Sequence, residues 1–105
     1  MTEVPSCALD DDGLARQHER YVRLAPAVAE MRRDGPQLTV QFAPDYDRRA
    51  LTELIAVERE CCPFFGFWFD EGARRLAVGV TAAEHAPALD AIAELLRRRP
   101  AHSPR

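Results

Sequence analysis

The chain has 105 residues, of which 47% are hydrophobic and 30% charged, and this composition is ordinary for one globular domain with a single core. A net charge of −3 argues against a nucleic-acid partner, and no apolar run approaches the roughly 20 residues that a membrane-spanning helix needs. The N-terminal segment is acidic and has no apolar stretch, so it does not resemble a secretory signal, and we expect a cytoplasmic location. One domain is expected over residues 1–97, followed by a flexible basic tail over residues 98–105.

The first predicted element is a helix over residues 13–33, which any of the three aspartates before it can cap. Pro26 interrupts this helix, because a proline inside a helix removes a backbone hydrogen bond. We therefore expect a break near Leu24–Ala25 and a second short helix that begins at Pro26 and stops before Gly35. A short strand around Val4–Leu9 is a further option at the N-terminus.

The rest of the chain alternates between strands and helices. Residues 37–42 alternate apolar and polar side chains, as in a strand with one buried face. Helical spacing follows over residues 45–62, where Asp45 or Asp47 can cap the helix. Two strands around a turn at Asp70–Ala73 come next, and then a last helix after residue 81. The order α-β-α-β-β-α predicts an α+β domain: a small, mainly antiparallel sheet of three or four strands, with helices packed on one face.

Two adjacent cysteines, Cys61 and Cys62, end the second long predicted helix just before Pro63. Neighbouring helical residues point about 100° apart, so both thiols can face one site only if the helix ends between them. Pro63 favours such an end, because the residue before a proline leaves the helical conformation. We expect instead that one thiol faces a site and that the other packs in the core, where free cysteines are common.

Glu58 lies on the same predicted helix face, three residues before Cys61 and four before Cys62, so its carboxylate can neighbour both thiols. One interpretation makes Glu58 part of a thiol site. The other places it at the margin of the apolar stripe, where its carboxylate reaches water. The sequence leaves both interpretations open.

The third cysteine, Cys7, precedes Asp10 by three residues, just before the first predicted helix. If the chain turns there, the thiol and the carboxylate share one side of it. The alternative is that Asp10 only caps the helix and that Cys7 is a half-buried strand residue. In a reducing compartment, three cysteines are free thiols, metal ligands or redox groups rather than structural disulfides.

Two short segments of the sequence resemble the alkylmercury lyases, the enzymes that cleave organomercurials: Cys7-Ala8-Leu9-Asp10, and Cys61-Cys62 followed by aromatic residues. The resemblance is confined to these segments. It implies that Cys7 and Cys61 bind the metal and that Asp10 donates a proton, which makes these three the catalytic residues. It also implies that Cys62 is a less essential neighbour.

These residue types suit a soft metal ion, because thiolates are the ligands that soft ions prefer. The candidate metal ligands are Cys7, Cys61, Cys62 and Glu58. No obligatory cofactor is indicated, and the metal ion would be a ligand or a product. Hg(II) is the first candidate, and Cu(I) or a trivalent metalloid are the other choices. Two thiolates on an organomercurial push electron density toward carbon, and a nearby acid, Asp10 or Glu58, can then protonate that carbon.

Other classes of function remain open. A thiol redox protein would attack an oxidant with Cys7 and resolve the product with Cys61 or Cys62. An interaction module would use its cysteines only to fill the core. A structural zinc site is not favoured, because the sequence has no C-x₂₋₄-C pair. The expected partner is a metal ion or small molecule, without nucleic acid or membrane, and a homodimer through the aromatic segment Phe64–Phe69 is a further option.

Overall fold

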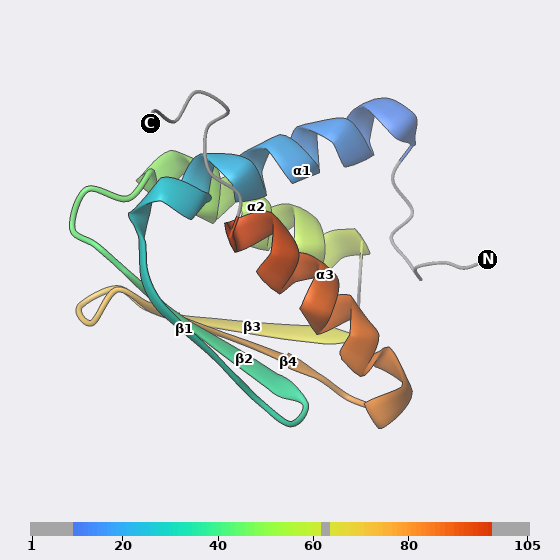
Figure 1. Ribbon diagram of the computed structural model, residues 1–105. Helices are drawn as coiled ribbons and strands as arrows, with labels where there is room; N and C mark the ends of the chain where they lie inside the picture. Colours follow the sequence, from blue (N-terminus) through green and yellow to red (C-terminus); the bar gives the residue numbers. More distant parts are fainter. Residues whose placement is uncertain (1–9, 62–63, 98–105) are drawn as a thin grey trace.

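The computed structural model describes residues 10–61 and 64–97, which form three α-helices and four strands (Figure 1). The elements are, in chain order, α1 (Asp11–Leu24), the 3₁₀ turn η1 (Ala25–Ala27), β1 (Val28–Asp34), β2 (Gln37–Phe42), α2 (Arg48–Cys61), β3 (Phe65–Asp70), β4 (Arg75–Val80), the 3₁₀ turn η2 (Ala83–His85) and α3 (Ala86–Arg97). All neighbouring strands are antiparallel, and the sheet order is β1-β2-β4-β3. The predicted α+β class, with helices on one face of an antiparallel sheet, is confirmed.

The core lies between the helices and the inner face of the sheet. In β2 the predicted alternation is confirmed, because Leu38, Val40 and Phe42 are buried. Strand β4 repeats the pattern with Leu76 and Val78. The helices contribute Tyr21, Leu24, Leu51, Leu54, Leu89, Ile92 and Leu96, and Tyr46 and Phe67 complete the set of large buried side chains. Burial of this apolar surface is the main favourable contribution to folding.

The predicted second short helix after Pro26 is wrong, because residues 28–34 form strand β1. The order of elements is therefore α-β-β-α-β-β-α rather than α-β-α-β-β-α. β1 pairs with β2 through a tight turn at Gly35, whose φ of 61° is a conformation that glycine adopts without strain. The glycine that was expected to stop a helix instead closes a hairpin.

A β-bulge explains why the sequence of β1 resembles a helix. The register of β1 against β2 shifts between Val28 and Glu30, so one residue is extra on the β1 side. As a result Val28 and Met31 lie opposite the buried residues Phe42 and Val40, although they are three residues apart. A spacing of three is typical of a helix face, and here the bulge produces it in a strand.

Aspartates begin two of the helices, as the sequence predicts. Asp10 is the N-cap of α1, and its Oδ1 accepts a hydrogen bond from the backbone N–H of Gly13 at 2.7 Å. Asp47 precedes α2, and its Oδ1 accepts from the N–H of Ala50 at 3.0 Å. Each carboxylate satisfies an N–H group that the first turn of a helix leaves unpaired.

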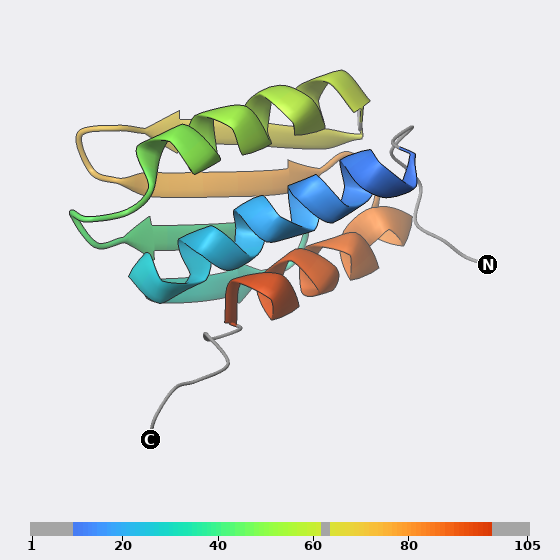
Figure 2. The same ribbon diagram turned by 90° about the horizontal axis from the view of Figure 1, so that it is seen from above.

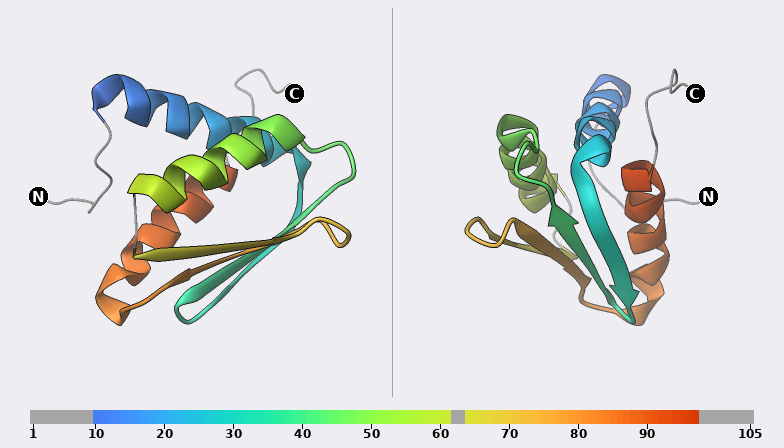
Figure 3. Two further views of the ribbon diagram at one scale, coloured as in Figure 1. Left: turned by 180° about the vertical axis from the view of Figure 1, so that it is seen from behind. Right: turned by 60° about the vertical axis from the view of Figure 1, so that its left-hand side comes forward.

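The three helices lie together on one face of the sheet (Figures 2 and 3). α2 packs against β3, α3 packs against the other three strands, and α1 contacts both other helices. α1 and α2 run in opposite directions, so the start of α1 and the end of α2 lie at the same end of the helical layer. None of the described helices covers the other face, which we call the outer face of the sheet.

Two expectations concern residues that the structure does not describe: the optional strand around Val4–Leu9 and the tail over residues 98–105. The single domain over residues 1–97 likewise stays a prediction. No helix among the described residues is long and apolar enough to cross the hydrocarbon layer of a bilayer.

Candidate functional site

A buried carboxylate joins α1 to α2. Glu58 of α2 is only 6% exposed, although glutamates are rarely buried. Its Oε2 accepts two hydrogen bonds from α1, one from the hydroxyl of Tyr21 at 2.7 Å and one from Nε2 of Gln17 at 3.1 Å. These two donors offset the loss of water around the carboxylate, because a buried polar group is tolerated when it is hydrogen bonded.

Further hydrogen bonds extend this contact into a network. Nε2 of Gln17 also donates to the carbonyl oxygen of Leu54 at 3.1 Å, and Oε1 of Gln17 accepts from Nη1 of Arg20 at 2.7 Å. Among the described residues, every buried side-chain nitrogen or oxygen has a partner. We call Gln17, Arg20, Tyr21 and Glu58 the Glu58 cluster; it fixes how the two helices face each other.

Burial and the neighbouring Glu58 also change the acidity of Tyr21. Burial raises the pKa of the Tyr21 hydroxyl well above its ordinary value of 10.0, and the negative charge of Glu58 and its hydrogen bond raise it further. Tyr21 is therefore a neutral hydrogen-bond donor throughout the physiological pH range.

The interpretation that Glu58 lies at the margin of an apolar stripe and reaches water is wrong, since its side chain is buried between two helices. Sequence reasoning missed both of its partners, Gln17 and Tyr21. A signal was present, because Gln17 precedes Tyr21 by four residues and shares its helix face. When each of two helices carries a polar residue on its core face, the two polar side chains can form a hydrogen bond with each other.

Cys61 is the last residue of α2 and lies one turn beyond Glu58 on the same side of the helix. It is a free, half-buried cysteine. The end of α2 is tied to the sheet two residues earlier, where Nη2 of Arg59 donates to the carbonyl oxygen of Phe67 at 2.8 Å. The thiol of Cys61 thus stands at the end of a helix that contacts both α1 and β3.

The other predicted site residues are only partly described. Asp10 begins α1, at the end of the helical layer where α2 ends, and it is exposed with Oδ1 engaged in the helix cap. Cys7 and Cys62 lie outside the described residues. Of the predicted site, the structure therefore places Glu58, Cys61 and Asp10, and the meeting of the thiols stays a prediction.

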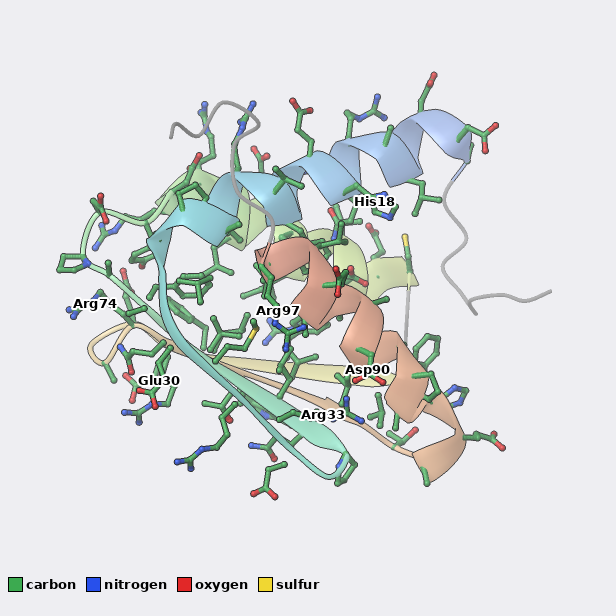
Figure 4. All side chains as sticks on the ribbon, viewed as in Figure 1. His18, Glu30, Arg33, Arg74, Asp90 and Arg97 are labelled. Atoms are coloured by element: carbon green, nitrogen blue, oxygen red, sulfur yellow. The ribbon has the colours of Figure 1, made fainter. Side chains whose placement is uncertain are left out.

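Within residues 10–61 and 64–97, no group of three or more histidine, cysteine or acidic side chains is placed to hold a metal ion. His18 is exposed on α1 (Figure 4). His85 stacks on Phe64, with the ring centroids 4.6 Å apart. A thiolate metal site at this end of the fold therefore requires Cys7 or Cys62 in addition to Cys61.

The aromatic segment after the cysteines is divided between two environments. Phe67 is buried in the core, and Phe65 and Phe69 are half-buried beside it. Trp68 points to the opposite face and is 60% exposed. Most of the segment is therefore core, and a homodimer through Phe64–Phe69 stays a prediction.

No protein-family model, curated protein or solved structure matches this chain. The resemblance to alkylmercury lyases thus rests on its two short segments and stays a prediction. The function has to be argued from the geometry of the fold and the chemistry of its residues.

Proposed function

We propose that this protein binds a soft metal ion, Hg(II) first, through the thiolates of Cys7 and Cys61, with Cys62 assisting. One observation carries the proposal: α1 begins and α2 ends at the same end of the helical layer (Figure 2). In the sequence, Cys7 precedes α1 by a few residues, Cys61 ends α2 and Cys62 directly follows it, so all three are joined to the same end of the fold.

The length of the chain before α1 supports this arrangement. Cys7 is three residues from Asp10, and an extended chain covers at most about 3.6 Å per residue, so this tether spans no more than about 11 Å. Cys62 directly follows Cys61. All three thiols are thus confined to the region around the two helix ends, which is what one shared ion requires.

A bound cation also suits the electrostatics at the end of α2. The C-terminus of a helix carries a partial negative charge, which disfavours a bare thiolate at Cys61. Metal binding reverses this preference, because it drives the proton from the thiol. Glu58, held one turn away by Tyr21 and Gln17, adds a negative charge near the ion and is the carboxylate that can serve as a further ligand.

Cleavage of organomercurials extends the same proposal. A cysteine thiol gives its proton to the carboxylate of Asp10 as its sulfur binds the mercury. Both thiolates then hold the mercury, the carbon–mercury bond breaks, and Asp10 passes the proton to the carbon, which leaves as the hydrocarbon. The mercury stays on the two thiolates. Because Oδ1 of Asp10 also caps α1, a test of this step has to keep the cap and remove only the acid.

Titration of the reduced protein with Hg(II), followed by counting free thiols, tests the binding. One equivalent is expected to bind and to remove the thiols of Cys7 and Cys61 together. Affinity should fall by about a hundredfold or more in Cys7→Ser and in Cys61→Ser, and less in Cys62→Ser, since even indirect contacts to a metal are worth about ten- to a hundredfold. If the three thiols react independently, or if oxidation yields one defined disulfide while Hg(II) shows no preference, the metal proposal fails.

Phenylmercury tests the lyase step through release of benzene. Asp10→Asn removes the acid and keeps a good N-cap, because asparagine caps helices as well as aspartate does. Benzene release should be lost in Asp10→Asn and kept in the control Asp12→Asn, which removes an acid from the first turn of the same helix. Hg(II) binding should be the same in both. Binding without benzene release by the unchanged protein would make it a sequestrant and refute the lyase step.

A further inference from the structure

The outer face of the sheet carries a shallow hollow with a volume of about 340 Å³. Its lining comes from β1, β2 and β4 and consists of Glu30, Arg32, Thr39, Gln41 and Arg75. Strand pairing arranges the residues of this face in rows across the sheet. One row is Glu30, Gln41, Arg75 and Asp70, and the next is Arg32, Thr39, Ala77 and Trp68.

Trp68 of β3 lies on the same face, outside the lining of the hollow, and forms a flat aromatic surface. Its indole lies over two glycines: a β-carbon on Gly66 would stand 2.5 Å from Cη2 of the ring, and one on Gly79 would stand 3.5 Å from Cζ3. Glycine at residue 66 therefore lets the ring lie close to the backbone. Because the side chain is still 60% exposed, one side of the indole rests on the sheet and the other faces solvent.

Two arginines of the hollow are available for an anion. Among the described residues, neither Arg32 nor Arg75 has a carboxylate partner. Their neighbours along the chain are engaged instead: Arg33 pairs with Asp90 of α3 (Figure 4), and Nε of Arg74 donates to the carbonyl oxygen of Phe42 at 3.0 Å. The two guanidinium groups at the hollow can thus exchange water for a ligand.

We propose that the outer face binds a small ligand that combines a planar ring with an anionic group, as a nucleoside monophosphate does. The ring stacks on Trp68, and the phosphate receives charge-assisted hydrogen bonds from Arg75 and Arg32. Trp68 lies opposite Ala77, so Arg75 is its diagonal neighbour, with α-carbons about 7–8 Å apart. The ring itself lies over the next row, at Gly66 and Gly79, so the ligand extends from there over the short side chain of Ala77 to reach Arg75.

A small anion fits this face better than a single strand of nucleic acid. Proteins that bind single strands present a positively charged groove with several stacking aromatics. This protein has a net charge of −3, and Trp68 is the one aromatic side chain in the rows of the outer face. The proposed site lies on the opposite side of the sheet from the helices and Cys61, so it does not depend on the metal proposal.

Trp68 is the single tryptophan of the chain, so its fluorescence reports directly on the proposed site. AMP is expected to quench the emission saturably, adenosine to do so more weakly, and inorganic phosphate to compete without quenching. Arg32→Gln and Arg75→Gln should each weaken AMP binding about tenfold, the loss of one hydrogen-bonded charge. Arg49→Gln on α2, whose side chain is 87% exposed, is the matched control and should leave binding unchanged.

Calorimetry with Trp68→Leu adds a measurement that does not rely on fluorescence. Loss of stacking should weaken AMP binding about tenfold or more. Absence of saturable quenching by AMP, or equal affinity in the unchanged protein and both arginine variants, would overturn the proposal. So would much tighter binding of a single-stranded oligonucleotide, or a change of emission with protein concentration alone, because a nucleic acid or a second copy would then be the occupant.

Discussion

Charged side chains meet two opposite environments in this protein. Between α1 and α2, Glu58 is shielded from water and held by donors at 2.7 and 3.1 Å. On the outer face of the sheet, Arg32 and Arg75 border an open hollow, and no described carboxylate pairs with them. A buried charge has to be satisfied by the fold itself, whereas an exposed charge keeps its water and can exchange it for a ligand.

This contrast separates stability from binding. The Glu58 cluster should act first as a link that sets the packing of α1 on α2, and with it the end of the fold where Cys61 lies. The outer face should contribute little to stability and most to recognition. Substitutions of similar residues should therefore change the stability of the protein strongly between the helices and only weakly on the outer face.

The largest difference is expected within β4. Leu76 is buried against the helices, and Leu76→Ala should lower the free energy of unfolding by about 3 kcal/mol through lost burial and the cavity left behind. Arg75→Ala, one residue earlier on the outer face, should change it by no more than about 0.5 kcal/mol. Urea unfolding measures both, and similar losses in the two variants would mean that the outer face is not open.

A smaller loss is expected in α2. Glu58→Ala removes the acceptor for Tyr21 and Gln17 and leaves two buried donors unpaired, so we expect about 2–3 kcal/mol of destabilisation. The control is Glu60→Ala, an exposed position two residues further along the helix, where about 0.5 kcal/mol or less is expected. Equal stability of the two variants would refute the structural role of the Glu58 cluster.

Tyr21 should make stability depend on alkaline pH. Its pKa is raised well above 10.0 in the folded protein, so the unfolded chain loses this proton first as the pH rises. The contribution of Tyr21 is fully present below pH 10 and is lost above it, by about 1.4 kcal/mol per pH unit, until the raised pKa is reached. Denaturant unfolding on both sides of pH 10 checks this, and Tyr21→Phe should remove that part of the decline. An identical decline in Tyr21→Phe would contradict the assignment.

The smallest effect on stability should come from Gly66→Ala. The new β-carbon displaces the far end of the Trp68 side chain, which can rotate away, so stability should change by only about 0.5 kcal/mol. The fluorescence of Trp68 should nevertheless change, and quenching by AMP should weaken. Unaltered emission in Gly66→Ala would show that the ring does not rest on this glycine.

The sequence predicts those parts of the fold that depend on local pattern. The buried alternation of β2 and the aspartate caps of α1 and α2 were predicted because each depends on neighbouring residues. Strand β1 was not, because a bulge between Val28 and Glu30 gives its half-buried residues helical spacing. A bulge is a property of two paired strands and cannot be seen in one.

The same limit applies to the candidate sites. The nearness of Glu58 to Cys61 follows from their spacing on one helix, but the pairing of Glu58 with Gln17 depends on how two helices pack. The hollow on the outer face was not predicted, because it requires β1 and β4 to flank β2. Sheet order is set by the whole fold, so residues as distant as Arg32 and Arg75 reveal their relation only in the structure.

The meeting of Cys7 with Cys61 is the central claim about function, and mass spectrometry of the Cys62→Ser protein tests it most directly. The dilute, reduced protein would receive one equivalent of Hg(II) and then be cleaved after arginine. A single mercury ion joining residues 1–16 to residues 60–74 within one chain is the predicted result. Mercury found on each segment separately, or only between two chains, would contradict the claim.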